Sequence, residues 1–408
     1  MYRTLLYIFL TLFINIIVIG CIKNEDDRFI PDTVPAEEED VVNQDEEEVV
    51  SQNDEDNISQ NDDDIISQNK GIEILLNNLK YTYDYNDTPY DVWSVAFISD
   101  VHGNTDNLIR FKEFCDYYSS YIDIMLHGGD TVMISFNDEH QNVDVVEKAG
   151  LGEMLNCIGN HDVAFYNDGV FIWDFYKKSV ERRVEVYNKI IGQFILSWDV
   201  EQPDNASEEG LCYYYKDFDN SKIRLIVLDS TESDSYMNKQ IVWLDSVLND
   251  TISAGSKANG YSVVICQHYI PCSRELFVPI KNPFTSVIPP IEFNHNAALI
   301  KTVTSYMEKG GSFVCYLAGH NHKDYCGYFT VNGRKQLVID IATGGGYISA
   351  FRDYHVENNS NSQDCFDIIG VDTKLKLLKI IRIGAETDLT LREKKTVCFN
   401  YERCELIK

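Results

Sequence analysis

The sequence predicts an α/β domain in which helices pack against a sheet, and three observations carry this prediction. Short apolar runs, rich in β-branched and aromatic residues, recur over residues 92–318, and each stops abruptly at polar residues. Continuous apolar runs of this kind are typical of strands that are covered on both faces. Between the first two runs, residues 107–118 carry apolar side chains at helical spacing. The order strand, helix, strand therefore predicts a sheet with helices packed on it.

Five of the predicted strands end in residues that bind metals or transfer protons. The segments that follow them are Asp-Val-His from Asp100, His-Gly-Gly-Asp from His127, Gly-Asn-His-Asp from Gly159, Gln-His from Gln267 and Gly-His-Asn-His from Gly319. Ligands bind at the carboxyl ends of strands in open α/β sheets, so we expect one common site. A lone histidine is more often a buried structural residue. Six of the nine histidines lie in these segments, however, and this concentration argues against that alternative for the set.

The residue types at these strand ends indicate a metal centre. Oxygen and imidazole donors without thiolate suit Mn, Fe or Zn. Asp100 and His102 are two residues apart and share one side of an extended segment, and His320 and His322 repeat that spacing. The candidate donors at these strand ends are Asp100, His102, Asp130, Asn160, His268, His320 and His322.

The five motifs, in this order, resemble those of the calcineurin-like metallophosphoesterases over roughly residues 92–345. The resemblance implies a four-layer α/β/β/α sandwich with mixed sheets and flanking helices. It also implies two divalent ions that share Asp130. The first would add Asp100, His102 and His322, and the second Asn160, His268 and His320. A hydroxide bridging two such ions is the nucleophile that attacks the phosphoester.

The resemblance assigns His161 as the general acid or phosphate-contacting imidazole, oriented by Asp162. For Asp162, a cap of its loop is the alternative. Asn104 contacts phosphate or simply forms a turn after Gly103, and the two interpretations are equally supported.

Several branches of the family fit poorly. The acidic-arginine-glycine run of Ser/Thr protein phosphatases is replaced here by Thr131-Val132-Met133-Ile134, and Met133 stands where purple acid phosphatases carry a ligand tyrosine. Too few residues follow His322 for the added domain of 5′-nucleotidases. The choice between a phosphomonoester and a phosphodiester therefore stays open.

Residues 1–21 are typical of a lipoprotein signal peptide. One arginine precedes an apolar stretch, which ends in Val-Ile-Gly-Cys at Cys21. This end resembles the bacterial lipobox, whose cysteine is lipidated and becomes the mature N-terminus. An uncleaved signal anchor is the alternative. We expect an exported protein, anchored by a lipid on Cys21 on the outer side of the cytoplasmic membrane or on the cell surface.

Residues 22–71 are predicted to be a disordered acidic tether. Residues 22–70 carry 18 acidic and 3 basic side chains. Their net charge of −15 is half of the net charge of −30 of the whole chain. Three copies of a polar octamer begin at Val49, Asn57 and Ile65, and they offer no continuous apolar face. The catalytic domain then spans residues 72–408. It has no basic stripe, so a nucleic-acid duplex is not an expected partner.

Ten cysteines remain apart from Cys21, and no CxxC pair is present, which argues against a cysteine zinc site. Disulfides between Cys398 and Cys404 or between Cys315 and Cys326 are conceivable in an exported protein. The alternative is that cysteines inside apolar runs are small buried hydrophobic residues, which we favour for Cys115, Cys157, Cys266 and Cys315.

Together these patterns predict an extracytoplasmic hydrolase of small phosphoesters that uses two divalent metal ions. A surface-binding or envelope-remodelling lipoprotein that acts on a polymer or lipid headgroup is the alternative. An inactive scaffold is a third, which the complete ligand set argues against. Neither the metal nor the oligomeric state follows from the sequence.

Overall fold

The computed structural model describes residues 72–83, 89–103, 105–132, 154–163, 165–167, 170–172, 179–192, 195, 198–231, 234–281, 293–341, 365–384 and 396–407. All of them belong to the compact unit Asp62–Lys408. The predicted signal peptide, the lipobox and the whole of the predicted tether lie outside the described residues, as does Asn104. What the sequence predicts for them therefore stays a prediction.

Two seven-stranded mixed sheets form the centre of the unit. Sheet 1 has the order β11-β13-β14-β12-β10-β9-β8, and β14, β12, β10 and β9 run parallel. Its strands are β8 (Tyr214–Phe218), β9 (Ile223–Val227), β10 (Ser262–Cys266), β11 (Val278–Pro279), β12 (Ser312–Ala318), β13 (Tyr325–Val331) and β14 (Arg334–Asp340). The antiparallel neighbours β8 and β13 make this sheet mixed.

Sheet 2 has the order β18-β17-β16-β15-β3-β4-β5. Its strands are β3 (Trp93–Ile98), β4 (Ile124–His127), β5 (Met154–Asn156), β15 (Cys365–Asp372), β16 (Leu377–Gly384), β17 (Thr396–Asn400) and β18 (Glu405–Leu406). The three N-terminal strands are parallel, whereas β15 to β18 are antiparallel.

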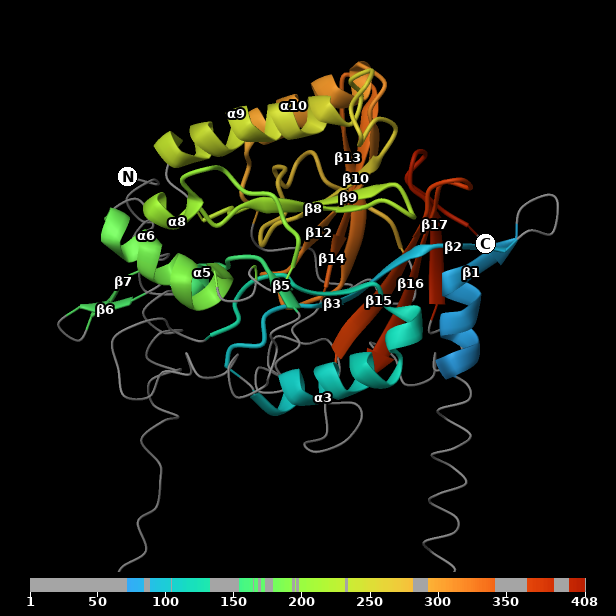
Figure 1. Cartoon of the computed structure of the whole chain (residues 1–408), viewed down its shortest axis with the longest axis horizontal. Helices are drawn as coiled ribbons and strands as arrows, with labels where there is room; N and C mark the ends of the chain where they lie inside the picture. The colour runs from blue at the N-terminus through green and yellow to red at the C-terminus, as the bar shows by residue number, and fades with distance from the viewer. Residues whose placement is uncertain are drawn as a thin grey trace, which may run out of the picture. The chain divides into compact units, whose positions relative to one another are not determined.

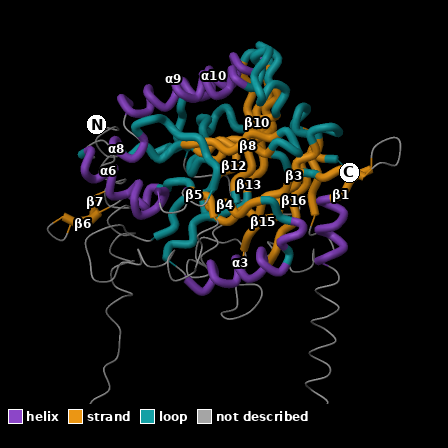
Figure 2. Tube along the Cα trace, in the orientation of Figure 1, coloured by secondary structure: helices purple, strands orange, loops and turns teal. Residues whose placement is uncertain are grey.

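Helices cover the outer face of each sheet (Figures 1 and 2). On sheet 1 lie α9 (Asp234–Asp250) and α10 (Ala297–Glu308), and on sheet 2 lie α3 (Thr105–Tyr117) and a helix over residues 72–80. The remaining elements are β1 (Tyr81–Tyr83), β2 (Pro89–Asp91), η1 (Ser119–Tyr121), α5 (Asn160–Val163), β6 (Phe165–Asn167), β7 (Val170–Ile172), α6 (Val180–Val186), the π-helix η3 (Tyr187–Gly192) and α8 (Ala206–Glu209). The predicted four-layer α/β/β/α architecture is confirmed.

The alternation of side chains along β3 explains how the layers are held together. Trp93, Val95 and Phe97 belong to the large core between the two sheets. Ala96 and Ile98 point to the opposite face and join a second core under α3 and residues 72–80. Since both faces are covered, every residue of β3 is buried. This explains why the run from residue 93 to residue 98 is apolar almost throughout.

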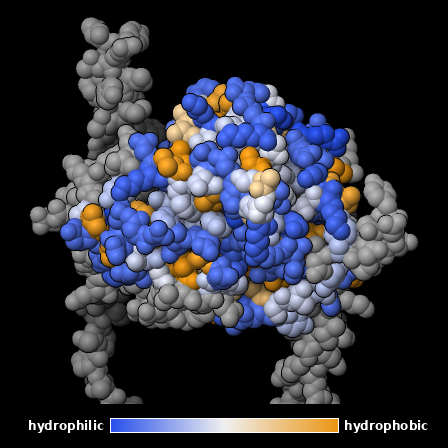
Figure 3. Space-filling view, turned by 45° about the horizontal axis from the view of Figure 1, so that its top comes forward, coloured by the Kyte–Doolittle hydropathy of each residue, from blue (hydrophilic) through white to orange (hydrophobic). Residues whose placement is uncertain are grey.

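The surface of the described part is mostly polar. On the face shown in Figure 3, hydrophilic residues predominate and hydrophobic ones lie in small separate patches. Among the described helices, none is both long and apolar enough to cross a membrane.

Each of the ten cysteines after Cys21 is a free thiol in the structure. The suggested pairings of Cys398 with Cys404 and of Cys315 with Cys326 are therefore wrong. Cys315 and Cys326 lie on strands that pack within the core, where each fills space as a small apolar side chain. The favoured interpretation of Cys115, Cys157, Cys266 and Cys315 as buried hydrophobic residues is confirmed.

Candidate metal centre

The seven predicted ligands come from the carboxyl ends of five parallel strands. In sheet 2 the neighbouring strands β3, β4 and β5 deliver Asp100 with His102, Asp130, and Asn160. In sheet 1 the neighbours β10 and β12 deliver His268, and His320 with His322. Because both sets of strands end at the same edge of the sandwich, donors from two sheets meet there. The structure thus brings all seven predicted ligands together.

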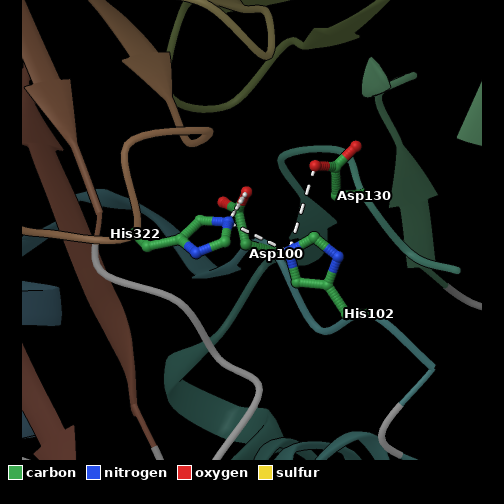
Figure 4. Close-up of side chains that lie close together, drawn as sticks. All are labelled: Asp100, His102, Asp130 and His322. Carbon is green, nitrogen blue, oxygen red and sulfur yellow. Dashed lines mark hydrogen bonds and ion pairs between the residues drawn. The ribbon is translucent and has the colours of Figure 1, made fainter. Parts of the chain in front are cut away.

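The first donor group consists of Asp100, His102, Asp130 and His322, whose ligand atoms lie within 4.8 Å of one another (Figure 4). His102 Nε2 is 3.0 Å from His322 Nε2 and 4.0 Å from Asp130 Oδ2. His322 Nε2 is 3.4 Å from Asp100 Oδ1. Two imidazole nitrogens that face each other among carboxylates offer their lone pairs to one point, which fits a shared cation.

The second donor group contains Asp130, His268 and His320. Asn160 lies between the two imidazoles, because its Oδ1 is 3.1 Å from His268 Nε2 and 2.8 Å from His320 Nδ1. His268 Nδ1 donates to the carbonyl of Gly128 at 2.9 Å. That bond turns Nε2 toward the donor group, as a bond to the outer ring nitrogen does at metal-bound histidines.

Asp130 belongs to both groups, and its surroundings fit a bridging ligand. Its side chain is buried, and Oδ1 accepts a hydrogen bond of 2.8 Å from the backbone N–H of His161. Oδ2 makes no hydrogen bond of good geometry, although His268 Nε2 lies 3.2 Å away. A buried carboxylate oxygen without a hydrogen bond is costly unless a cation neutralises it. The donor set therefore fits bound metal ions.

The electrostatics of the donor groups agree with this fit. Burial raises the pKa of Asp130, but the neighbouring imidazoles, His268 foremost, outweigh burial and hold that pKa well below its usual range. Burial lowers the pKa of His268, but Asp130 raises it to about 10. The carboxylate of Asp130 thus favours positive charge beside it, as a metal ligand does.

The backbone at the site is strained. Five of the predicted ligands have positive φ angles, namely Asp100 (55°), His102 (51°), Asp130 (57°), His320 (72°) and His322 (56°). Non-glycine residues seldom adopt this conformation, and it costs of the order of 1–3 kcal/mol each. Such strain persists where the surrounding structure dictates it, and it gathers at functional sites.

Two glycines allow the ligand loops to approach each other. A Cβ atom on Gly159 would lie 2.1 Å from Asp130 Oδ1, and one on Gly319 would lie 2.4 Å from Asp100 Oδ2. Neither distance is possible between real atoms. The glycines in the predicted motifs are therefore required by the close packing of the ligands.

Replacing Gly159 by Ala is expected to displace Asp130 and to weaken metal binding by about 10- to 100-fold, the usual cost of disturbing the surroundings of a ligand. Isothermal titration of the full chain with Mn²⁺ measures this. Gly370→Ala is the matched control, since its Cβ would also clash, 2.6 Å from Leu79 Cγ, but in the core under residues 72–80. Unchanged affinity in Gly159→Ala would contradict the packing argument.

His161 and Asp162 occupy different environments. His161 is half-buried beside the first donor group, with its ring centroid 4.5 Å from that of His102. Asp162 is buried and accepts hydrogen bonds from the backbone amides of Asp130, Gly159 and Val132, at 2.9, 2.9 and 3.1 Å. These contacts support the alternative of a loop cap for Asp162. Its action on His161 stays a prediction, as does the catalytic role of His161.

Sequence reasoning missed His127, which lies inside the second motif. Its ring is fully buried, with Nδ1 3.2 Å from the backbone N of Gly129 and 3.3 Å from Thr131 Oγ1. Burial lowers the pKa of His127 to about 4, against a smaller opposing effect of Asp100 and Asp130. Its position as the last residue of β4, next to the predicted ligand segment, is the sequence feature that could have identified it.

The pKa of His127 predicts an acid effect on stability. Between pH 6.5 and about 4 the unfolded chain binds a proton here that the folded chain does not. The contribution of His127 to the free energy of unfolding therefore falls as the pH is lowered through this window, by up to about 1.4 kcal/mol per pH unit. In EDTA, the stability advantage of wild type over His127→Gln should shrink from about pH 7 to about pH 4.5 in urea unfolding. A constant difference would show that His127 is not held neutral.

Two further residues border the centre. The ring of Tyr269 lies 4.1 Å from that of His320, centroid to centroid. Asp340, at the end of β14, is buried and accepts a 2.8 Å hydrogen bond from Asn321 Nδ2, between His320 and His322. Both contacts depend on tertiary packing, which the sequence does not display.

Comparisons with known proteins give a distant likeness. No family model matches the chain, and no curated protein matches it. Among solved structures, it is similar to a conserved uncharacterized protein of Streptococcus pneumoniae, described as a predicted phosphoesterase, with 10% identity over 71% of this chain and 88% of that one, at a TM-score of 0.26. A protein of Thermus thermophilus shares 9% identity over 71% and 99%, with a TM-score of 0.35.

A structure described as a novel phosphatase from Mycoplasma pneumoniae shares 11% identity over 78% of this chain and 93% of that one, at a TM-score of 0.27. At such scores the likeness carries no conclusion about activity. The fold assignment rests on the two sheets and their helices, and the metal centre rests on its own donor atoms.

Proposed function

We propose that the chain is an extracytoplasmic hydrolase of small phosphoesters that uses two divalent metal ions, Mn, Fe or Zn. One observation carries the proposal: two groups of oxygen and imidazole donors share the buried carboxylate of Asp130. Centres of this composition suit first-row divalent ions. Two ions held by one carboxylate would supply a nucleophilic hydroxide and neutralise phosphate charge.

The side chains of the site supply the metal ligands and a proton donor for the leaving group. Asp100, His102 and His322 hold one side of the centre, and Asn160, His268 and His320 hold the other. The half-buried His161 lies at the margin of the first group, where it can donate a proton to a leaving oxygen. The two sheets fix the donors in advance, so little reorganisation is needed during the reaction.

The test uses the full chain, freed of metal and then loaded separately with Mn²⁺, Fe²⁺, Zn²⁺ or Ca²⁺. Hydrolysis of an aryl phosphate, of a bis-aryl phosphate and of pyrophosphate is measured for each ion. We expect metal-dependent turnover of at least one ester, and the ratio of the two rates separates a monoesterase from a diesterase. A chain that binds these ions but hydrolyses neither ester nor pyrophosphate would refute the proposed activity.

The export part of the proposal is supported by the apolar N-terminal stretch and its Val-Ile-Gly-Cys end. A lipid on Cys21 would tether the enzyme, with residues 22–71 as a charged spacer that lets it reach soluble substrates. Labelling cells with a fatty-acid probe tests this. Wild type should carry the label and lack residues 1–20, whereas Cys21→Ala should not be labelled. An unlabelled wild-type chain would overturn the anchor.

A further inference from the structure

The loop that carries His320 and His322 is tied to both sheets by buried carboxylates. On sheet 1, Asn321 donates to Asp340 of β14 at 2.8 Å. At its other end the loop reaches Asp324, which directly precedes β13 and is buried. The carboxylate of Asp324 contacts Arg382, which lies on β16 of sheet 2.

Arg382 contacts two carboxylates at once. Its Nη1 donates to Asp324 Oδ2 at 2.8 Å, and its Nη2 donates to Asp324 Oδ1. Its Nε donates to Asp367 Oδ1 at 2.7 Å. Arg382, Asp324 and Asp367 are exposed by only 1%, 4% and 3%, so water does not compete for these bonds. A planar guanidinium that engages one carboxylate through two nitrogens fixes orientation as well as distance.

The position of Asp367 connects this cluster to the other ligands. Asp367 lies on β15, opposite Arg382 on β16 and opposite Phe97 on β3. Phe97 is three residues before Asp100, the first ligand delivered by β3. The guanidinium therefore links β15, the neighbour of β3, to the loop of His322. The segment after β3 and the loop of His322 supply facing ligands of the first donor group.

We propose that Arg382 is a positioning residue that sets the distance between His322 and the Asp100–His102 segment, and thereby the metal affinity of the first donor group. The proposal rests on the metal centre proposed above. A contribution to stability alone would also explain a buried ion cluster, so the test needs a readout that stability does not change.

Arg224 provides the matched control. It is also exposed by only 1%, and its Nε and Nη2 donate to the two carboxylate oxygens of Asp217 at 2.7 Å each. It stands near the start of β9, however, whereas the ligands follow the ends of the strands. Arg224→Met should therefore lower stability without changing metal binding.

The experiment titrates the metal-free full chain with Mn²⁺ and records the visible spectrum after loading with Co²⁺. We expect Arg382→Met to weaken metal binding by about 10- to 100-fold, in the range of substitutions that disturb the residues supporting metal ligands, and to alter the Co²⁺ bands. Arg382→Lys should recover part of the affinity, because it keeps the charge but not the paired contact. Arg224→Met should retain the affinity and spectrum of wild type.

Equal affinities and spectra for wild type and Arg382→Met would overturn the positioning role while leaving the proposed function intact. If the wild-type chain binds neither Mn²⁺ nor Co²⁺, the proposed metal centre itself is refuted. If Arg382→Met fails to fold, the metal affinities of Asp324→Asn and Arg382→Lys are measured instead. Each is expected to lose affinity, and wild-type affinity in both would overturn the proposal.

Discussion

Replacing Asp130 by Asn is expected to reduce phosphoester hydrolysis by at least about 10³-fold, which corresponds to roughly 4 kcal/mol of transition-state stabilisation. Asn keeps the size of the side chain and one oxygen, but it removes the charge that both donor groups share. The loss should be larger than for a ligand of one ion only, because both ions lose a contact. The measurement is kcat with saturating Mn²⁺, together with the bound metal per chain after gel filtration.

Asp372→Asn is the control for this variant. Asp372 is also buried, and it accepts hydrogen bonds from Tyr90 Oη at 2.8 Å and from the backbone N–H of Leu375 at 2.8 Å. It lies at the end of β15 that pairs with the start of β3, away from the ligands. The Asp372→Asn variant should have a lower free energy of unfolding and an unchanged kcat. If Asp130→Asn keeps both its turnover and two bound ions, the bridging role is wrong.

That the seven candidate ligands come together could be predicted from sequence, because parallel strands deliver their carboxyl ends to one edge. The five motifs are local, each directly after an apolar run, and the rule that sites form at strand ends then joins them. The positive φ angles of Asp100 and Asp130 were not visible in this way. They arise because the loops from two sheets must turn sharply to bring their donors together.

Other features of the site depend on pairings between distant segments. Asp162 bonds to amides about 30 residues earlier in the chain, and Arg382 meets Asp324 across 58 residues. Periodicity and motif spacing report the local conformation of the chain, not which side chains meet across two sheets. The same reason explains the wrong suggestion of disulfides, since closeness in sequence did not indicate how the cysteines are placed in the core.

Removal of metal ions with EDTA is expected to lower the free energy of unfolding by several kcal/mol. An ion that binds only the folded chain contributes about 4 kcal/mol when its free concentration is about 1,000 times its dissociation constant. Without ions, the buried carboxylates of Asp100 and Asp130 depend on the imidazoles around them to balance their charge. Urea unfolding with and without EDTA measures the change, and an unchanged midpoint would contradict a resident metal.

The dependence on ion concentration separates one ion from two. Above saturation, stability should rise by about 1.4 kcal/mol for each tenfold increase in free Mn²⁺ if one ion is released on unfolding, and by about 2.7 kcal/mol if two are. We expect the larger slope for wild type and for Asp372→Asn. Asp100→Asn removes a ligand of the first donor group only, so its slope should fall toward that of one ion. Asp130→Asn weakens both groups, and its stability should respond least to the metal.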